Sequence, residues 1–482
     1  MAAPADFLNF IDVNKDRFIQ RLARAVEIPS VSGDPAHRED VFRMASFLET
    51  QLKQYGVETK AVELGTHIMD GQTLKLPPAI LGRIGDDRAK KTILIYGHFD
   101  VQPAQLSDGW DFPPFELTRD EKTGRLYGRG STDDKGPIFG WINVLDAHHT
   151  LNKPLPVNLR FCFEGMEESG SEGLDEFILA EVKKGKDSWF DGVDAVCISD
   201  NYWLNTRTPA LTYGLRGISY YRVTVSGPAR DLHSGAFGRM VHEPMTDLII
   251  LMSKLVDPQG NILIPGIDEM VPPPDEEERH LYRNIDYSLE DVEISTGAKI
   301  TISEDKASAL MGRMRSPSLS LHGIEGAFYG AGGKTVIPAK VTGKFSIRLV
   351  PPQTPENVDP LVVKFLSAEF AKLGSKNSIN VEDLHGGKPW VEDYKHWNYE
   401  AAHRATEAVY KQAPDYMREG GSIPVTLTFA EALGVNVLLL PMGRGDDGAH
   451  STNEKLDTSN FIEGTKLLGS YLHEAGAGTK AR

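Results

Sequence analysis

Residues 93–101 read ILIYGHFDV, a run of apolar residues that ends in His98 and Asp100. A metal-ligating imidazole commonly gives its second ring N–H to a carboxylate, which fixes the tautomer and raises the basicity of the ligand. His98 and Asp100 therefore suit a metal ligand and the residue that orients it. Taken alone, the same pair also fits an ordinary polar loop after a buried strand, so its meaning depends on the rest of the chain.

Four further segments place acidic or imidazole side chains beside apolar runs. They are residues 128–137 (GRGSTDDKGP) with Asp133 and Asp134, residues 157–173 (VNLRFCFEGMEESGSEG) with Glu167 and Glu168, residues 194–200 (DAVCISD) with Asp200, and residues 435–454 (VNVLLLPMGRGDDGAHSTNE) with His450. Ligands in open α/β sheets collect beyond the carboxyl ends of the strands. The joint occurrence of these segments favours one shared site over separate solvated turns.

Length and composition limit the class of protein. A chain of 482 residues is too long for one ordinary core, so we expect two domains. A net charge of −16 argues against a nucleic-acid partner, which would require clustered basic residues. Residues 1–26 lack the pattern of a signal peptide. No uncharged stretch is long enough to span a lipid bilayer, so we expect no membrane partner. We expect a cytoplasmic protein in which Cys162 and Cys197 are reduced core thiols.

The order of apolar patterns predicts the fold class. Helix and strand patterns alternate up to residue 200, as in the helix-like residues 39–56 and the strand-like residues 92–97, which indicates a mainly parallel sheet flanked by helices. From residue 211 the pattern changes, and residues 217–227 and 339–350 resemble strands with one buried face.

The α/β pattern resumes after residue 390, so we predict an α/β catalytic domain interrupted by an inserted α+β domain. The expected boundaries are 1–212 and 385–482 for the catalytic domain and 213–384 for the insertion. Other expected elements are an amphipathic helix in residues 1–26, a helix in residues 243–256 and a surface loop in residues 270–280.

Carboxylates combined with two imidazoles suit a divalent transition metal better than calcium or magnesium, which prefer oxygen ligands. Five ligands are too many for one tetrahedral zinc site, whereas a bridging carboxylate allows two ions about 3.5–4 Å apart. In the pair Glu167 and Glu168, one carboxylate can bind metal while its neighbour takes a proton from water. An acidic first helical turn would explain the same pair without any metal.

Five motifs resemble those of the metallopeptidase family that includes carnosine dipeptidases, carboxypeptidase G and aminoacylase. The motifs are GHFDVQP (97–103), GRGSTDDKG (128–136), EGMEESGSEG (164–173), ISDN (198–201) and MGRGDDGAHSTNE (442–454). The resemblance covers nearly the whole chain. Plainer matches such as SLSLHGIEGAF (318–328) and REGGSIPVTLTF (418–429) are most similar to the cytosolic non-specific dipeptidases and the fungal Cys-Gly dipeptidases of this family.

The resemblance implies two divalent metal ions in each subunit. His98 and Asp200 would bind one ion, Glu168 and His450 would bind the other, and Asp133 would bridge them. Zinc is the expected metal, with manganese as the alternative.

The resemblance also implies catalytic roles. Glu167 would be the general base and acid, Asp100 would orient His98, and the peptide bond into Asp134 would be cis. Peptide hydrolysis would proceed through a metal-bound hydroxide.

The inserted domain would serve as a lid and dimerisation domain of a homodimer. By the same resemblance, His233 of one subunit would reach the active site of its partner, and Arg348 would bind the substrate carboxylate. Glu419 is the candidate for the substrate ammonium group. Further substrate contacts would come from Thr335, His385, Gly421 and Ser422. Without the resemblance, His233 also fits an ordinary turn histidine, Arg348 an outward-facing arginine of a strand, and Glu419 a loop acid. Arg239 departs from the family pattern, because close relatives often have glycine there.

The predicted function is hydrolysis of short unblocked dipeptides such as Cys-Gly, as in glutathione breakdown. A bound carboxylate and ammonium leave room for little more than two residues. Two alternatives remain open: a deacylase of N-acyl amino acids with the same fold, and a non-catalytic scaffold. Against the scaffold, every ligand position and the base are filled.

Overall fold

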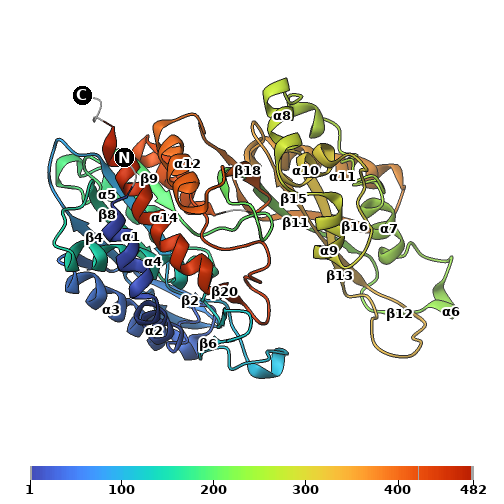
Figure 1. Cartoon of the computed structure of the whole chain (residues 1–482). Helices are drawn as coiled ribbons and strands as arrows, with labels where there is room; N and C mark the ends of the chain where they lie inside the picture. Colours follow the sequence, from blue (N-terminus) through green and yellow to red (C-terminus); the bar gives the residue numbers. More distant parts are fainter. Residues whose placement is uncertain (1–2, 422, 479–482) are drawn as a thin grey trace. The chain divides into compact units, whose positions relative to one another are not determined.

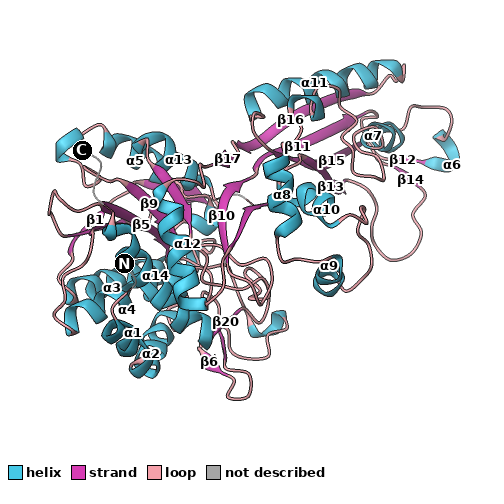
Figure 2. Cartoon of the chain, turned by 45° about the horizontal axis from the view of Figure 1, so that its top comes forward, coloured by secondary structure: helices cyan, strands magenta, loops and turns pink. Residues whose placement is uncertain are grey.

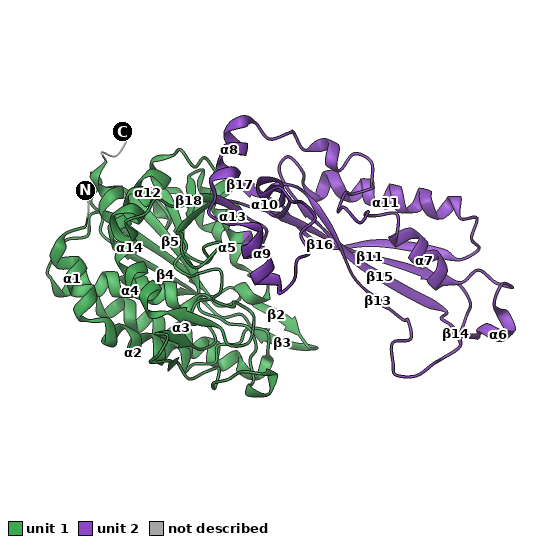
Figure 3. Cartoon of the chain, turned by 45° about the vertical axis from the view of Figure 1, so that its right-hand side comes forward, with its two compact units in different colours: residues 1–213, 392–416, 425–482 green, residues 214–391, 417–424 purple. Residues whose placement is uncertain are grey.

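The computed structural model (Figure 1) describes residues 3–421 and 423–478, which form two compact units (Figure 3). Unit 1 comprises residues 1–213, 392–416 and 425–482, and unit 2 comprises residues 214–391 and 417–424. Unit 2 is therefore an insertion in the chain of unit 1, with a short second segment.

The described residues form a large sheet of nine strands (Figure 2). Its order is β1-β4-β8-β5-β9-β19-β10-β17, and β18 pairs with β10. The strands are β1 (Glu58–Val62), β4 (Ala79–Ile84), β5 (Thr92–His98), β8 (Asn158–Glu164), β9 (Ala195–Ile198), β10 (Ala210–Leu215), β17 (Trp390–Val391), β18 (Asp415–Glu419) and β19 (Asn436–Leu439).

The centre of this sheet is parallel and its outer strands are antiparallel. Strands β8, β5, β9 and β19 run in the same direction, whereas β4 pairs antiparallel with β8, and β10 pairs antiparallel with β19. All seven residues of β5 are buried, as expected for a parallel strand covered on both faces. The carboxyl ends of the four central strands therefore lie along one edge, where a site can be assembled.

Helices cover both faces of the parallel centre. On one face α4 (Lys135–Thr150) packs against β5 and α14 (Thr458–Ala477), with α1 (Ala5–Val13), α2 (Lys15–Val26) and α12 (Trp397–Tyr410) beside them. On the other face, Phe429 of α13 (Pro424–Leu433) packs edge-on against Tyr96 of β5. Unit 1 also contains α3 (Arg38–Gln54), α5 (Leu174–Val182), a hairpin of β2 (Thr66–Met69) and β3 (Gln72–Lys75), and a small sheet of β6 (Thr118–Arg119), β7 (Arg125–Tyr127) and β20 (Lys455–Asp457).

Gly97 allows the end of β5 to approach the start of α4 closely. A Cβ atom at this position would lie 2.6 Å from Asp134 Oδ2 and 2.8 Å from Ile138 Cγ1. Both distances are shorter than van der Waals contact, so only glycine fits without a shift of the helix. This close approach brings His98, the next residue of the strand, to the loop that precedes α4.

Unit 2 is built on a four-stranded antiparallel sheet in the order β13-β15-β11-β16. These strands are β11 (Gly217–Ser226), β13 (Ser318–Glu325), β15 (Lys340–Leu349) and β16 (Ser378–Gly387). Helices α7 (Pro244–Met252) and α11 (Pro355–Lys372) share a core with one face of the sheet, in which the rings of Tyr221 and Phe345 stack at 4.9 Å. The remaining elements are β12 (Leu232–His233), β14 (Val336–Ile337), α6 (Ser234–Phe237), α8 (Glu276–Asn284), α9 (Leu289–Thr296) and α10 (Lys306–Met314).

The predicted fold class is confirmed, and two local expectations are wrong. The expected N-terminal helix is divided at Asn14 into α1 and α2, because the Asn14 backbone leaves the helical conformation. The acidic stretch expected to be a loop contains α8, since Asp275 caps it by accepting a hydrogen bond from the Glu278 backbone N–H. Within the described part of the chain, none of the helices is both long and apolar enough to cross a lipid bilayer.

We predict that Gly97→Ala lowers the free energy of unfolding by about 1–3 kcal/mol, because the added methyl group overpacks the contact between β5 and α4. Urea denaturation of the purified variant measures this change. Gly312→Ala is the matched control: it lies in α10 with no atom within 4 Å of its added Cβ, so stability should stay the same or rise by up to about 1 kcal/mol. A Gly97→Ala protein as stable as the wild type would contradict the close approach.

Candidate metal centre

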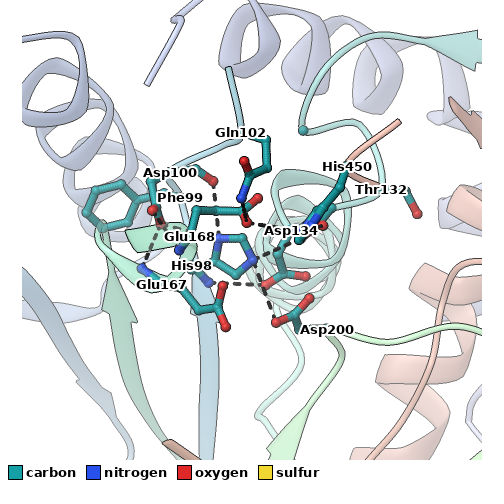
Figure 4. A network of polar contacts seen from close by, with 12 residues as sticks. His98, Phe99, Asp100, Gln102, Thr132, Asp134, Glu167, Glu168, Asp200 and His450 are labelled. Atoms are coloured by element: carbon teal, nitrogen blue, oxygen red, sulfur yellow. Dashed lines mark hydrogen bonds and ion pairs between the residues drawn. The ribbon is translucent and has the colours of Figure 1, made fainter. Parts of the chain in front are cut away.

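Residues from five separate segments of unit 1 meet beyond the carboxyl ends of its central strands (Figure 4). His98 ends β5, a 3-10 helix at Glu167–Ser169 follows β8, and Asp200 follows β9. Asp133 precedes α4, and His450 lies in the loop between β19 and β20. The sequence-predicted ligands, base and orienting aspartate are thus brought together in one place.

Asp133 lies between two imidazoles. Its Oδ1 is 3.0 Å from His98 Nε2, and its Oδ2 is 3.1 Å from His450 Nε2. Each imidazole also has a second carboxylate nearby: Asp200 Oδ2 is 3.6 Å from His98 Nε2, and Glu168 Oε2 is 3.1 Å from His450 Nε2. The two oxygens of Asp133 therefore face two separate pairs of possible metal ligands, each made of one imidazole and one carboxylate. A bridging carboxylate requires this arrangement.

Asp100 supports both His98 and the Glu167–Glu168 turn. His98 Nδ1 lies 3.1 Å from the Asp100 carbonyl oxygen and 3.3 Å from its Oδ1. The Asp100 carboxylate also accepts hydrogen bonds from the backbone N–H groups of Glu167, at 3.2 Å, and Glu168, at 3.1 Å. One fully buried carboxylate thus fixes the imidazole on one side and the turn with the two glutamates on the other.

Burial and charge shift the pKa values of these groups strongly. Burial raises the pKa of Glu168 and Asp200 and raises that of Glu167 well above its usual value. Hydrogen bonds to Asp133 and Glu168 raise the pKa of His450 to about 10, and the two imidazoles hold the pKa of Asp133 below its usual value despite burial. The carboxylates therefore need positive charge close by in order to remain ionised.

The donor set fits a divalent transition metal. One ligand atom each from His98, Asp133 and Glu168 lies within 4.8 Å of the other two. Imidazole together with carboxylate is a ligand combination that zinc and its neighbours accept, and a cation there would neutralise the gathered negative charge.

A second acidic group does not suit a metal, because a lysine already fills it. Asp446, Asp447 and Asp457 lie close together, and Lys455 Nζ donates to all three at 2.8, 2.7 and 2.5 Å. Its ammonium group supplies the positive charge that a cation would bring.

Gln102 belongs to the site although no role was predicted for it. Its Nε2 donates to Glu168 Oε2 at 2.7 Å (Figure 4). The signal was present in the sequence, since His98, Asp100 and Gln102 alternate with apolar residues and side chains at this spacing point to the same side of an extended chain. Asp134 also takes part, because its Oδ2 accepts the backbone N–H of His98 at 3.2 Å. The peptide bond between Asp133 and Asp134 is cis, as expected.

The predicted substrate residues belong to unit 2 and fall into groups. His233 and Thr335 are exposed and near each other, since the Ser234 backbone N–H donates to the Thr335 carbonyl oxygen at 3.1 Å. Arg348 and His385 lie on the two strands that flank β11, opposite Ile218 and Tyr220.

Glu419 ends β18. Its Oε1 accepts the backbone N–H of Gly420 at 2.7 Å and is 3.7 Å from Arg313 Nη2. A Cβ atom built on Gly421 would have no atom within 4 Å, so this turn offers open space. Ser422 lies outside the described residues.

Arg239 keeps a backbone conformation that glycine favours. Its φ angle is 64°, in the left-handed region that non-glycine residues adopt at a cost. The turn therefore has an arginine in a conformation that glycine adopts at lower cost.

The comparisons with known proteins agree with this geometry. Residues 94–474 match the peptidase family M20/M25/M40. The chain is 55% identical over 464 residues to a Cys-Gly metallodipeptidase of Schizosaccharomyces pombe, covering 96% of both chains. It is 45% identical over 468 residues to the human Beta-Ala-His dipeptidase, covering 96% of this chain and 91% of the relative.

The fold agrees equally well with solved structures. The dipeptidase Dug1p of Saccharomyces cerevisiae matches with a TM-score of 0.88 and 53% identity over 98% of both chains. Human carnosine dipeptidase 1 matches with a TM-score of 0.88 and 42% identity over 99% of this chain and 100% of the other. The expected enzyme class is confirmed, and the chain belongs to the metallopeptidases of family M20/M25/M40.

Proposed function

We propose that this protein is a dinuclear metal-dependent dipeptidase that hydrolyses short unblocked dipeptides, with Cys-Gly among its substrates. The observation that carries the proposal is the position of Asp133 between the imidazoles of His98 and His450. The names of the relatives that match over nearly their whole length support the choice of substrate. The proposal also assigns a role to each residue of the centre.

In this proposal two divalent ions, zinc or manganese, are held in unit 1. His98 and Asp200 would hold one ion, Glu168 and His450 would hold the other, and Asp133 would contribute to both. When bound, such ions lower the pKa of a water molecule and polarise the carbonyl group of the peptide.

Glu167 is proposed to move the protons of the reaction. It takes a proton from the attacking water and later gives one to the leaving amine. Burial raises the pKa of its carboxyl, which suits a group that must both accept and return a proton. Asp100 keeps this glutamate in place through its backbone N–H, while it orients His98.

Unit 2, the lid and dimerisation domain in this proposal, supplies the substrate contacts. Arg348 binds the substrate carboxylate, for which the planar guanidinium is suited. Further contacts with the substrate come from Thr335, His385, Gly421 and Ser422. Glu419 binds the substrate ammonium group, which must compete for its carboxylate with the Gly420 N–H and Arg313. The protein acts as a homodimer in which His233 reaches the partner's site and stabilises the developing oxyanion.

We further propose that the enzyme works in the cytoplasm, where Cys-Gly arises from glutathione breakdown. Cys162 and Cys197 are buried free thiols on the strands that flank β5, which suits a reducing compartment. Burial raises the pKa of both thiols, so neither is an activated nucleophile.

The purified protein, loaded with zinc or manganese, should hydrolyse Cys-Gly and other free dipeptides and lose this activity on chelation. Its kcat/KM should be much lower for the same dipeptides when they are N-acetylated, because the ammonium contact is lost. A coupled amino-acid assay over paired free and acetylated substrates measures the ratio. Preference for the acetylated members would instead identify a deacylase, and no turnover of either set with both metals bound would identify a scaffold.

Glu167→Gln should lower kcat for Cys-Gly by about 10²- to 10⁴-fold, because the general base is lost while its size is kept. Metal content should remain that of the wild type, as measured by elemental analysis of the dialysed protein. Glu176→Gln, an exposed glutamate on α5, is the control and should keep full activity. Near-normal turnover by Glu167→Gln would contradict its assignment.

Mixing of two inactive variants tests the contribution of His233 in trans. His233→Ala and Glu167→Ala subunits, unfolded and refolded together, should regain about a quarter of the wild-type activity, since half of a random mixture is heterodimer with one intact site each. Native mass spectrometry, with an affinity tag on one variant to separate the masses, measures the heterodimer fraction. Each variant refolded alone should remain inactive, and heterodimers without activity would exclude the role in trans.

A further inference from the structure

Glu454 joins the two loops of unit 1 that carry Asp133 and His450. Its carboxylate is fully buried and lies four residues after His450. Oε1 accepts the backbone N–H groups of Thr132, at 3.0 Å, and Asp133, at 3.1 Å. The carboxylate of one loop is therefore bonded to the peptide backbone of the residue that lies at the centre of the metal cluster.

The second oxygen completes this set of bonds. Oε2 accepts the backbone N–H of Gly130 at 3.0 Å and Nη1 of Arg129 at 2.8 Å. The Glu454 carbonyl oxygen also accepts the Gly128 N–H at 3.0 Å. Five donors of residues 128–133 thus converge on a single residue, and each carboxylate oxygen accepts two of them. Removing such an acceptor would leave several buried donors without a partner, which is costly.

A weaker connection links the same loops on the other side of His450. Thr132 Oγ1 donates to Asp447 Oδ2 at 2.9 Å, and Lys455 Nζ bonds to the other oxygen of Asp447 at 2.7 Å. His450 is therefore held between two attachment points, three residues after one and four residues before the other.

The loop between these attachment points needs such support. His450 has a φ of 61° and Asn453 a φ of 60°, both in the left-handed region that non-glycine side chains disfavour. The His450 side chain is 60% exposed, so little packing holds it, whereas that of His98 is 1% exposed. The attachments at Glu454 and Asp447 help to fix the imidazole relative to Asp133, together with the bond from Arg129 Nη2 to the Ser451 carbonyl oxygen at 3.2 Å.

We infer that Glu454 is a positioning residue that sets the separation of His450 from Asp133 and thereby the metal affinity of one half of the cluster. The half concerned is the one formed by Glu168 and His450. The other half shares Asp133 but takes its remaining ligands, His98 and Asp200, from the ends of β5 and β9, and the donors that Glu454 accepts all belong to residues 128–133. This inference rests on the proposed dinuclear site.

The test is the metal affinity of the apo protein carrying Glu454→Gln. The amide nitrogen of glutamine cannot accept, so two of the donors of residues 129–133 lose their acceptor. Competitive titration with zinc and a chromophoric chelator should show one ion bound as in the wild type and the second about 10- to 100-fold more weakly. The kcat/KM for Cys-Gly should recover when zinc is raised, which general unfolding would not allow.

The matched control is Glu181→Gln. Glu181 is also buried in unit 1, and its carboxylate accepts hydrogen bonds from the Trp189 N–H and Lys184 Nζ, neither of which belongs to a loop of the metal cluster. Both zinc affinities should stay at the wild-type values in this variant. If Glu454→Gln fails to fold, Thr132→Val, which removes only the hydrogen bond to Asp447, takes its place with an expected severalfold loss at the second ion.

Two outcomes overturn the inference: unchanged affinity for both ions, or an equal loss of both in a variant with the circular dichroism of the wild type. Failure of the proposed function looks different, because it is seen in the unmutated protein. A wild type that binds one ion, or binds two and leaves dipeptides uncleaved, rejects the dinuclear dipeptidase whatever the variants do.

Discussion

Asp133 joins the charged groups of the candidate metal centre in unit 1. A carboxylate that is only 6% exposed is costly to ionise, yet its two oxygens lie 3.0 and 3.1 Å from two imidazoles that keep its pKa low. The carboxylates around them in turn raise the pKa of both imidazoles. Each group is stable in its charged form only because the others are in place, so the cluster forms as a whole. A divalent cation fits the same constraint, since it replaces the imidazole protons as the source of positive charge.

The insertion of unit 2 divides the chain of unit 1 between the residues of this cluster. His98, Asp133 and Glu168 come before the insertion in the chain and His450 comes after it, so the two parts of unit 1 must meet accurately. Strand β19 achieves this by pairing in parallel with β9, residue for residue from Asn436 to Leu439, which brings the following loop to the same edge of the sheet. The register of one central strand pair therefore fixes the last ligand, whatever the length of the insertion.

The sequence predicted the parts of the site that depend on local pattern and missed those that depend on distant contacts. Apolar runs ending in His98, Glu167 and Asp200 indicated strand ends because burial on both faces leaves a continuous hydrophobic signature. Glu454 lay inside a recognised motif but carries no local signal of its role, since its partners are backbone N–H groups more than three hundred residues earlier. Likewise, the break at Asn14 depends on backbone conformation rather than on the spacing of apolar residues, which continues across it.

Two acidic groups of unit 1 show how the chain separates structure from chemistry. Asp446, Asp447 and Asp457 surround Lys455, whose ammonium bonds to all three and whose pKa they raise. Arg125 lies 3.4 Å from Asp446 and Arg444 lies 3.5 Å from Asp457, so three permanent cations balance the three carboxylates. The titratable cationic partners of Asp133, Glu168 and Asp200 are the imidazoles of His98 and His450. Imidazoles lose their proton far more readily than lysine and then present a nitrogen lone pair. The first arrangement closes the group to any other cation. The second arrangement can release the imidazole protons and bind a metal ion in their place. The nature of the cationic partner, rather than the number of carboxylates, therefore makes the first group structural and the second a candidate metal centre.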